Sequence, residues 1–288
     1  MKVLFATDGA EPSERARELL ARLADRARTQ VVALSVNGFE SAMRSARHAG
    51  HFSPEQGHAV AKLAVDEAVE ALTAAGFEQV DGRVEDGDEA SEIVHAVDHD
   101  GFELVVVGSG KERWLDTFVL GSVSSSIVHA SPCPILVVHH APEPGRAVGV
   151  VVGADGSEGA NHSLAAFIGL ADPARCEVTV VAVAVPIALP SGWPAGAATR
   201  SVGVNDAEMA LARRHATEAT DTLAEAGFSV EQEVVAGGAA GVLLDQTEQR
   251  EADLVVVGAR GLGRFRAKVL GSVSDRVIRH APATLVGR

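Results

Sequence analysis

Glycine and serine residues near the carboxyl terminus have the types and the spacing of a phosphate-binding loop. Gly258, Gly261 and Gly271 are separated by two and by nine residues. Ser272 and Ser274 follow the last of these glycines. Glycine lets a backbone approach a ligand closely, and the first turn of a helix presents unpaired N–H groups and the positive end of its dipole. The pattern therefore predicts a bound phosphate, with a nucleotide as the expected carrier.

Two widespread nucleotide motifs do not account for this loop. The sequence lacks G-x-x-x-x-G-K-[ST], and neither Gly108 nor Gly261 begins a complete G-x-G-x-x-G. A glycine-rich connection that binds nothing is the alternative interpretation. We favour the phosphate site because it explains all three glycines and the serine together.

The elements that must position this loop alternate between strand and helix. An apolar β-branched run at 254–257 predicts a strand buried on both faces, and a helical pattern begins at Gly271 and Ser272. Strands are also predicted at 3–6, 30–36, 78–85, 104–107, 135–138, 147–154, 176–183, 229–235 and 284–286. Helices are predicted at 12–28, 55–75, 89–99, 122–130, 157–170 and 240–250, with another that ends at Gly227.

The second half of the chain repeats the first. The separation is 147 residues for Asp8 and Asp155 and for Val36 and Val183. It is 150 residues for Gly108 and Gly258 and for Gly121 and Gly271. Nearly constant offsets indicate a duplicated domain, so we expect domains at 1–141 and 147–288. Each should be an α/β domain with an open, doubly wound parallel sheet.

In such sheets ligands bind beyond the carboxyl ends of the strands, where the strand order reverses. Asp8 and Asp155 end the first strand of each half, and Gly108 and Gly258 end the fourth. If the first and fourth strands are neighbours, these groups meet at one edge of each sheet.

The composition limits the partners and the compartment. The net charge is −14 and the pI is near 5.2, which argues against nucleic acid and against an electrostatic membrane anchor. Cys133 and Cys176 show no metal-binding or redox spacing. Histidines spaced as metal ligands lack a cysteine or a carboxylate pair to complete a site. With no signal peptide and no apolar run of about 18 residues, we expect a cytoplasmic chain.

Four separated segments carry a family resemblance, and they do so in both halves. ATDGAEPS in the first half corresponds to GADGSEGA in the second. ELVVVGSGKERWLDTFVLGSVSSSIVHASPCPILVV in the first half corresponds to DLVVVGARGLGRFRAKVLGSVS and the closing VSDRVIRHAPATLVGR in the second. Each half resembles a universal stress protein domain, and the resemblance covers nearly the whole chain. It implies that each sheet binds an adenine nucleotide, namely ATP with or without Mg²⁺. It also implies an intramolecular pseudo-dimer of the two halves through their last strands, and a further homodimer of chains.

In the second half the resemblance places the nucleotide on the complete motif. Asp155 would lie by the adenine or the ribose, and Val183 would contact the base. The resemblance assigns the ribose and phosphates to Gly258, Ala259, Gly261, Gly271, Ser272, Val273 and Ser274. Arg260 and Arg264 lie in the intervening loop, where a guanidinium could bind phosphate bidentately. The alternative is that these arginines form a solvated face.

The first half keeps most of these positions but departs at one glycine. The matching residues are Asp8, Val36, Gly108, Gly121, Ser122 and Ser124. Lys111 stands where the second glycine should be, and Glu112 and Asp116 bring negative charge into the loop. We therefore expect weaker or absent nucleotide binding in the first half.

Three functions follow from these patterns. The first is a regulatory protein that senses ATP in a stress response. The second is a slow ATP hydrolase or a nucleotidyl-transfer enzyme on the same fold. The third is an interaction module without nucleotide. No residue is assigned a catalytic role, because Asp155 is expected at the nucleoside end and nothing at fixed spacing offers a base to activate water.

Overall fold

The computed structural model describes residues 1–38, 53–110, 113–114, 117–118, 120–185, 206–259 and 270–287. The strands of the first half are β1 (Lys2–Ala6), β2 (Gln30–Asn37), β3 (Gln79–Asp86), β4 (Leu104–Gly108), β5 (Arg113–Trp114), β6 (Thr117–Phe118) and β7 (Ile135–Val138). Its helices are α1 (Glu11–Leu23), α3 (Pro54–Ala74), α4 (Glu89–Asp100) and α5 (Ser122–Ala130).

The second half repeats this order. Its strands are β8 (Val148–Gly153), β9 (Cys176–Ala184), β10 (Val230–Ala236), β11 (Leu254–Gly258) and β12 (Ala283–Gly287). Its helices are α6 (Glu158–Leu170), α8 (Asp206–Glu225), α9 (Ala239–Gln249) and α10 (Ser272–Ile278), with a short 3-10 turn η1 (Pro173–Arg175).

Ten of the strands form one sheet, in the order β10-β9-β8-β11-β12-β7-β4-β1-β2-β3. Within each half of this sheet the neighbouring strands are parallel. The short strands β5 and β6 form a separate antiparallel pair. The doubly wound α/β class is therefore confirmed. In each half the first strand lies between the second and the fourth, so the expected neighbours, β1 with β4 and β8 with β11, are side by side.

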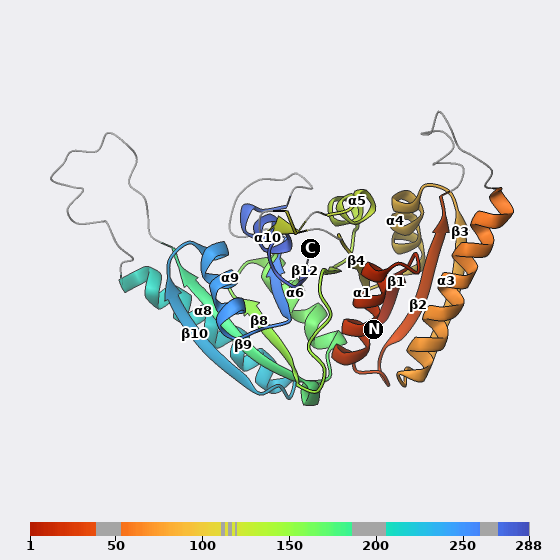
Figure 1. Ribbon diagram of the computed structural model, residues 1–288. Coiled ribbons are helices and arrows are strands. Elements are labelled where there is room, and N and C mark those ends of the chain that lie inside the picture. Colours follow the sequence, from red (N-terminus) through yellow and green to blue (C-terminus); the bar gives the residue numbers. More distant parts are fainter. Residues whose placement is uncertain are drawn as a thin grey trace, which may run out of the picture.

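The two halves join through their last strands (Figure 1). β7 and β12 pair in antiparallel register, with Leu136 opposite Leu285 and Ile135 opposite Val286. Every residue of both strands is buried. Each is the last strand of its own half's part of the sheet, and each covers the open hydrogen-bonding edge of the other.

A second junction ends helix α1 earlier than the sequence predicted. The helix stops at Leu23 and not near Arg28, because Ala24 forms an antiparallel bridge with Ala171. The N–H of Asp25 donates to the carbonyl of Leu170 at 2.8 Å, and that of Asp172 donates to Leu23 at 2.9 Å. Pairing with the other half thus replaces the last helical turn.

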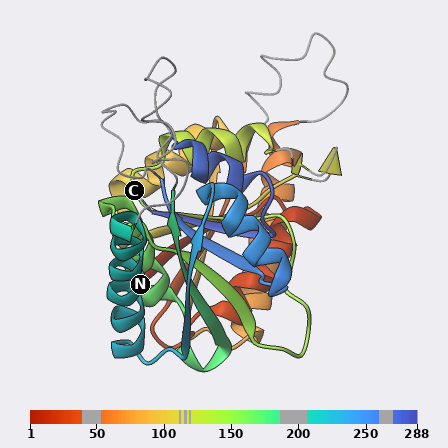
Figure 2. The same cartoon turned by 90° about the vertical axis from the view of Figure 1, so that its left-hand side faces the viewer.

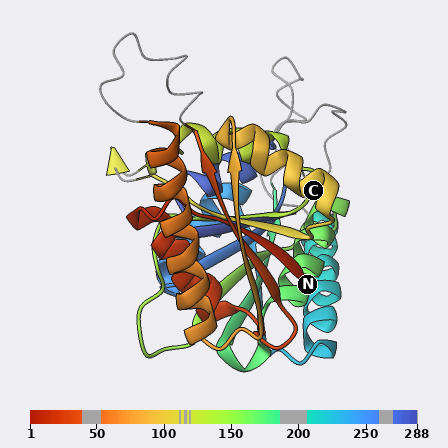
Figure 3. The same cartoon turned by 90° about the vertical axis from the view of Figure 1, so that its right-hand side faces the viewer.

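Helices cover both faces of each half. α3 packs on β2 and β3 (Figure 3), and α8 packs on β9 and β10 (Figure 2). One apolar cluster includes side chains of α1, α3, α6 and α8, and a second includes those of α4, α5, α9 and α10. Both clusters contain residues of both halves, so the core is continuous across the junction. Among the helices described, none is both long and apolar enough to cross a membrane.

Candidate functional site

The point where strand order reverses in the second half lies between β8 and β11. Val152 of β8 is in register with Val256 of β11, and Gly153 is in register with Val181 of β9. This register brings the carboxyl ends of β8, β9 and β11 to one edge. Asp155 and Gly258 lie at this edge, as predicted from the sequence, and a ligand site is expected there.

Asp155 is held by a turn that opens helix α6. Its Oδ1 accepts a hydrogen bond from the N–H of Ser157 at 2.9 Å, and Gly156 adopts a left-handed φ of +71°. Ser157 caps the helix, because its Oγ accepts from the N–H of Ala160 at 3.2 Å. The turn therefore fixes Asp155 at the edge, where the residue is exposed to solvent. Val183, near the end of β9, is half-buried.

The structure adds a residue that the sequence did not single out. His215 of α8 packs on the Asp155 turn, where a Cβ at Gly156 would lie only 2.4 Å from its Nε2. In the first half, Ala64 contacts Gly9 in the same way, at 3.2 Å from such a Cβ. His215 lies 60 residues beyond Asp155, so local spacing does not link the two residues. His215 follows Ala64 by 151 residues, the same offset that separates the repeated glycines Gly76 and Gly227. Only this offset could have shown that His215 and Ala64 occupy matching positions.

Gly258 is required by helix packing. A Cβ at this position would lie 2.5 Å from the backbone nitrogen of Ala160 and 2.7 Å from the carbonyl carbon of Gly159. In the first half a Cβ at Gly108 would lie 2.1 Å from the carbonyl oxygen of Pro12. The sequence predicted that these glycines let a ligand approach, and the described contacts show that they also let α6 and α1 approach closely.

The two ends of the second-half loop are tied together at Ala259. Its carbonyl accepts from the N–H of Gly271 at 2.7 Å and from Oγ of Ser274 at 2.9 Å. Ser274 Oγ is also 3.0 Å from the carbonyl of Gly271, and the residue is 1% exposed. The hydroxyl of Ser274, which the sequence predicted to hold phosphate, points inward here and closes the loop.

The first half uses the same device. Ser124 is buried and donates to the carbonyl of Gly108 at 3.0 Å. Ser122 and Ser272 differ from these inward serines, because both are exposed at the first position of their helices. Val273 follows Ser272 and is half-buried against the second apolar cluster.

The edge of the first half has a turn at Asp8 that resembles the turn at Asp155. Oδ1 of Asp8 accepts from the N–H of Ala10 and from Oγ of Ser13, both at 3.0 Å. Val36 of β2 is half-buried, and Gly121 precedes α5. A Cβ at Gly121 would have only Ser124 Oγ within 4 Å, at 3.9 Å, so this position has room for a side chain.

Several predicted residues lie outside the described part of the chain. They are Arg260, Gly261 and Arg264 in the second half and Lys111, Glu112 and Asp116 in the first. Next to the first-half group, Gly110 has a φ of +59° and its carbonyl accepts from Nη2 of Arg15 at 3.2 Å.

Two mycobacterial proteins are similar to this chain in sequence. A universal stress protein of Mycobacterium tuberculosis is 35% identical over 193 residues, which is 64% of this chain and 60% of the relative. Another, from Mycobacterium bovis, is 29% identical over 239 residues, covering 80% of this chain and 72% of the relative. The match to the first relative thus spans less than two thirds of that protein's length.

Solved structures share the fold. The crystal structure of a universal stress protein from Archaeoglobus fulgidus superposes with a TM-score of 0.68 at 20% identity, covering 100% of this chain and 98% of the other. A putative universal stress protein from Pseudomonas aeruginosa gives 0.61 at 15% identity, covering 99% and 92%. The model of the universal stress protein family matches twice, at residues 1–139 and 149–286. The chain therefore belongs to the universal stress protein family, with two family domains in tandem.

Proposed function

We propose that this chain is a tandem universal stress protein of the cytoplasm that binds ATP, with or without Mg²⁺, as a regulatory ligand in a stress response. The single observation that carries this proposal is the edge formed by β8, β9 and β11. Asp155, Val183 and the start of α10 meet there, at the reversal of strand order. Family membership supports the stress-response role.

The residues have distinct tasks in this proposal. The exposed carboxylate of Asp155 accepts hydrogen bonds from ribose or adenine, and Val183 supplies an apolar contact for the base. The first-turn N–H groups of α10 and the hydroxyl of Ser272 bind phosphate. Arg260 and Arg264 remain proposed phosphate ligands, and Gly261 remains the proposed place of close backbone approach.

The two halves have unequal tasks. We assign the dominant nucleotide site to the second half, at 147–288, and a degenerate site to the first half, at 1–141. The antiparallel pairing of β7 with β12 supports an intramolecular pseudo-dimer of these units. A homodimer of chains is a further proposal, drawn from the family resemblance.

We expect binding without efficient hydrolysis. The groups assigned to the phosphates are amides, hydroxyls and guanidinium groups, which stabilise a bound phosphate in its ground state. Asp155 is held in the turn by the N–H of Ser157 at the proposed nucleoside end. Binding that is equal in the ground and transition states does not raise the rate of the chemical step. Turnover should therefore be far below the ~1–10³ s⁻¹ of ordinary enzymes.

Calorimetric titration with ATP tests the proposal. The parent chain should bind ATP, Gly271→Glu should abolish the dominant binding, and Gly121→Glu should change it little. Circular dichroism of each variant should match the parent. No ATP binding by the parent, or loss in Gly121→Glu alone, would refute the proposal as stated. A steady-state turnover above about 1 s⁻¹ that Asp155→Ala abolishes would establish the enzyme alternative.

A further inference from the structure

Glu89, the first residue of α4, lies across the end of β2 in the first half. A Cβ at Gly38, the residue that follows β2, would lie 2.6 Å from Oε1 of Glu89 and 3.1 Å from its carboxyl carbon. Gly38 is two residues beyond Val36, the proposed base contact. The Glu89 carboxylate therefore stands next to the place where the base and ribose would bind.

Two further carboxylates belong to the same turn. Asp86 accepts from Nδ2 of Asn37 at 2.8 Å, and Asp88 caps α4 by accepting from the N–H of Ser91 at 3.0 Å. The protein around Glu89 desolvates its carboxyl group and raises its pKa, and the charges of Asp88 and Asp8 add to that rise. The acidic groups are thus close enough to act on one another at this edge.

The second half has no acid at the three matching positions. At the offset of 150 residues, the counterparts of Asp86, Asp88 and Glu89 are Ala236, Gly238 and Ala239. The turns themselves are equivalent. The N–H of Gly87 donates to the carbonyl of Asn37 at 3.2 Å, and that of Gly237 donates to Ala184 at 3.1 Å.

We propose that the carboxylates of the 86–89 turn exclude anionic nucleotide from the first half, and that the neutral 236–239 turn leaves the second half open to it. This inference rests on the proposed function and adds a determinant remote from the phosphate loop. A nucleoside triphosphate carries several negative charges, and each like charge brought near it raises the free energy of the complex. Glu89 also places a larger side chain at this position than Ala239 does in the second half.

Placing a glutamate at position 239, the second-half counterpart of Glu89, tests the inference. Ala239 is the first residue of α9, and α9 has no acidic residue in its first turn. Glutamate is favourable at such a position, so Ala239→Glu should fold. Ala239→Gln is the matched control because it adds nearly the same volume without the charge. ATP would be titrated by calorimetry into the full parent chain and both variants.

We expect Ala239→Glu to weaken ATP binding at least tenfold, equivalent to about 1.4 kcal/mol, and Ala239→Gln to weaken it less than threefold. The difference in ATP affinity between Ala239→Glu and Ala239→Gln should shrink as the salt concentration is raised, because salt screens partly exposed charges. Equal affinities for the parent and Ala239→Glu, or equal losses in both variants, would overturn the inference and leave the proposed function intact. A parent chain that binds no ATP would overturn the proposed function instead, and this inference with it.

The reverse exchange gives an independent readout. With the second site removed by Gly271→Glu, Glu89→Gln should strengthen ATP binding in the first half at least threefold relative to Gly271→Glu alone. Unchanged or weaker binding would count against the role of Glu89.

Discussion

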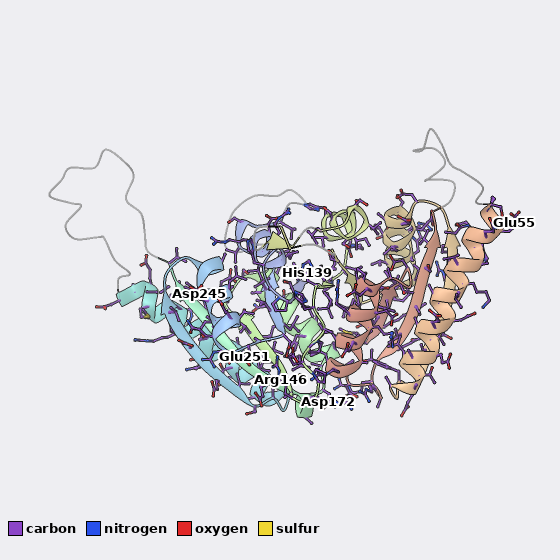
Figure 4. All side chains as sticks on the ribbon, in the orientation of Figure 1. Glu55, His139, Arg146, Asp172, Asp245 and Glu251 are labelled. Carbon is purple, nitrogen blue, oxygen red and sulfur yellow. The ribbon has the colours of Figure 1, made fainter. Side chains whose placement is uncertain are left out.

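Nε2 of His139, the residue after β7, lies 2.7 Å from the carbonyl oxygen of Ile278 in helix α10 of the second half. Nδ1 of the same ring lies 3.2 Å from the carbonyl oxygen of Ser109 in the first half. The residue is 1% exposed, and it lies between the two halves (Figure 4). One imidazole thus connects backbone groups of both halves, and its first-half partner Ser109 directly follows β4.

The stability of the chain should depend on pH through His139. Burial lowers the pKa of His139, the charges of His140 and Arg15 lower it further, and the two carbonyl contacts oppose this shift. Because the folded pKa lies below the unfolded value of about 6.5, protonation favours the unfolded chain. This contribution to stability is fully present above pH ~6.5 and is lost as the pH falls toward the folded pKa.

Urea unfolding of His139→Gln at several pH values checks this dependence. At pH 8 the variant should be less stable than the parent by about 1–3 kcal/mol, because a buried hydrogen bond between the halves is lost. The difference should narrow at pH 5.5. The exposed neighbour His140 provides the control as His140→Gln, which keeps both His139 contacts and should stay within about 0.5 kcal/mol of the parent at pH 8. A difference that stays constant or widens in acid would contradict the prediction.

Gly258→Ala should destabilise the second half through helix packing. Its Cβ would lie 2.5 Å from the backbone nitrogen of Ala160, and backbone cannot move aside cheaply. We expect a loss of about 1–3 kcal/mol in unfolding free energy, as for other overpacked sites. Gly241→Ala within α9 is the control, since a Cβ there meets nothing within 4 Å, and it should gain up to about 1 kcal/mol. Equal stability of both variants in urea would refute the packing role.

Ser274→Ala and Ser272→Ala should separate loop closure from ligand contact. Ser274 is buried and donates to backbone carbonyls, so its loss should cost about 1–3 kcal/mol of stability. Ser272 is exposed, so its loss should leave stability within about 0.5 kcal/mol but weaken ATP binding. Thermal unfolding and ATP calorimetry on both variants measure the two effects. Weaker ATP binding without loss of stability in Ser274→Ala, and lost stability in Ser272→Ala, would contradict the prediction.

His215→Ala should weaken ATP binding in the second half about threefold to tenfold, equivalent to roughly 0.7–1.4 kcal/mol. The imidazole packs on the turn that carries Asp155. The first half has Ala64 at the matching place, so alanine is the natural replacement for His215. Ala64→His is the matched control and should not create the dominant site. Calorimetry that shows parental affinity in His215→Ala would remove this residue from the site.

The two cysteines should differ in reactivity. Burial raises the pKa of the Cys176 thiol to about 12, and the charge of Asp172 adds to the shift. Cys133 is only half-buried. At pH 8 a thiol reagent should therefore modify one residue per folded chain, and mass spectrometry should identify it as Cys133. Cys133→Ser should abolish the fast reaction, and two fast equivalents in the parent would contradict this.

Much of the architecture was accessible from the sequence because it is encoded in local, periodic patterns. Apolar β-branched runs such as 254–257 predicted buried strands. The repeated offsets predicted two similar halves, and parallel strands then required Asp155 and Gly258 to meet at one edge. Each of these inferences uses residue spacing within one element or the order of successive elements.

Contacts between distant segments were decided only by the tertiary structure. The end of α1 depends on the bridge between Ala24 and Ala171, which are far apart in sequence. Ser274 looks like Ser272 in sequence, but helix position turns one hydroxyl onto Ala259 and leaves the other exposed. His215 reaches the Asp155 turn because α8 packs over β9. No local pattern specifies which side chains packing brings together, since that depends on the relative placement of whole elements.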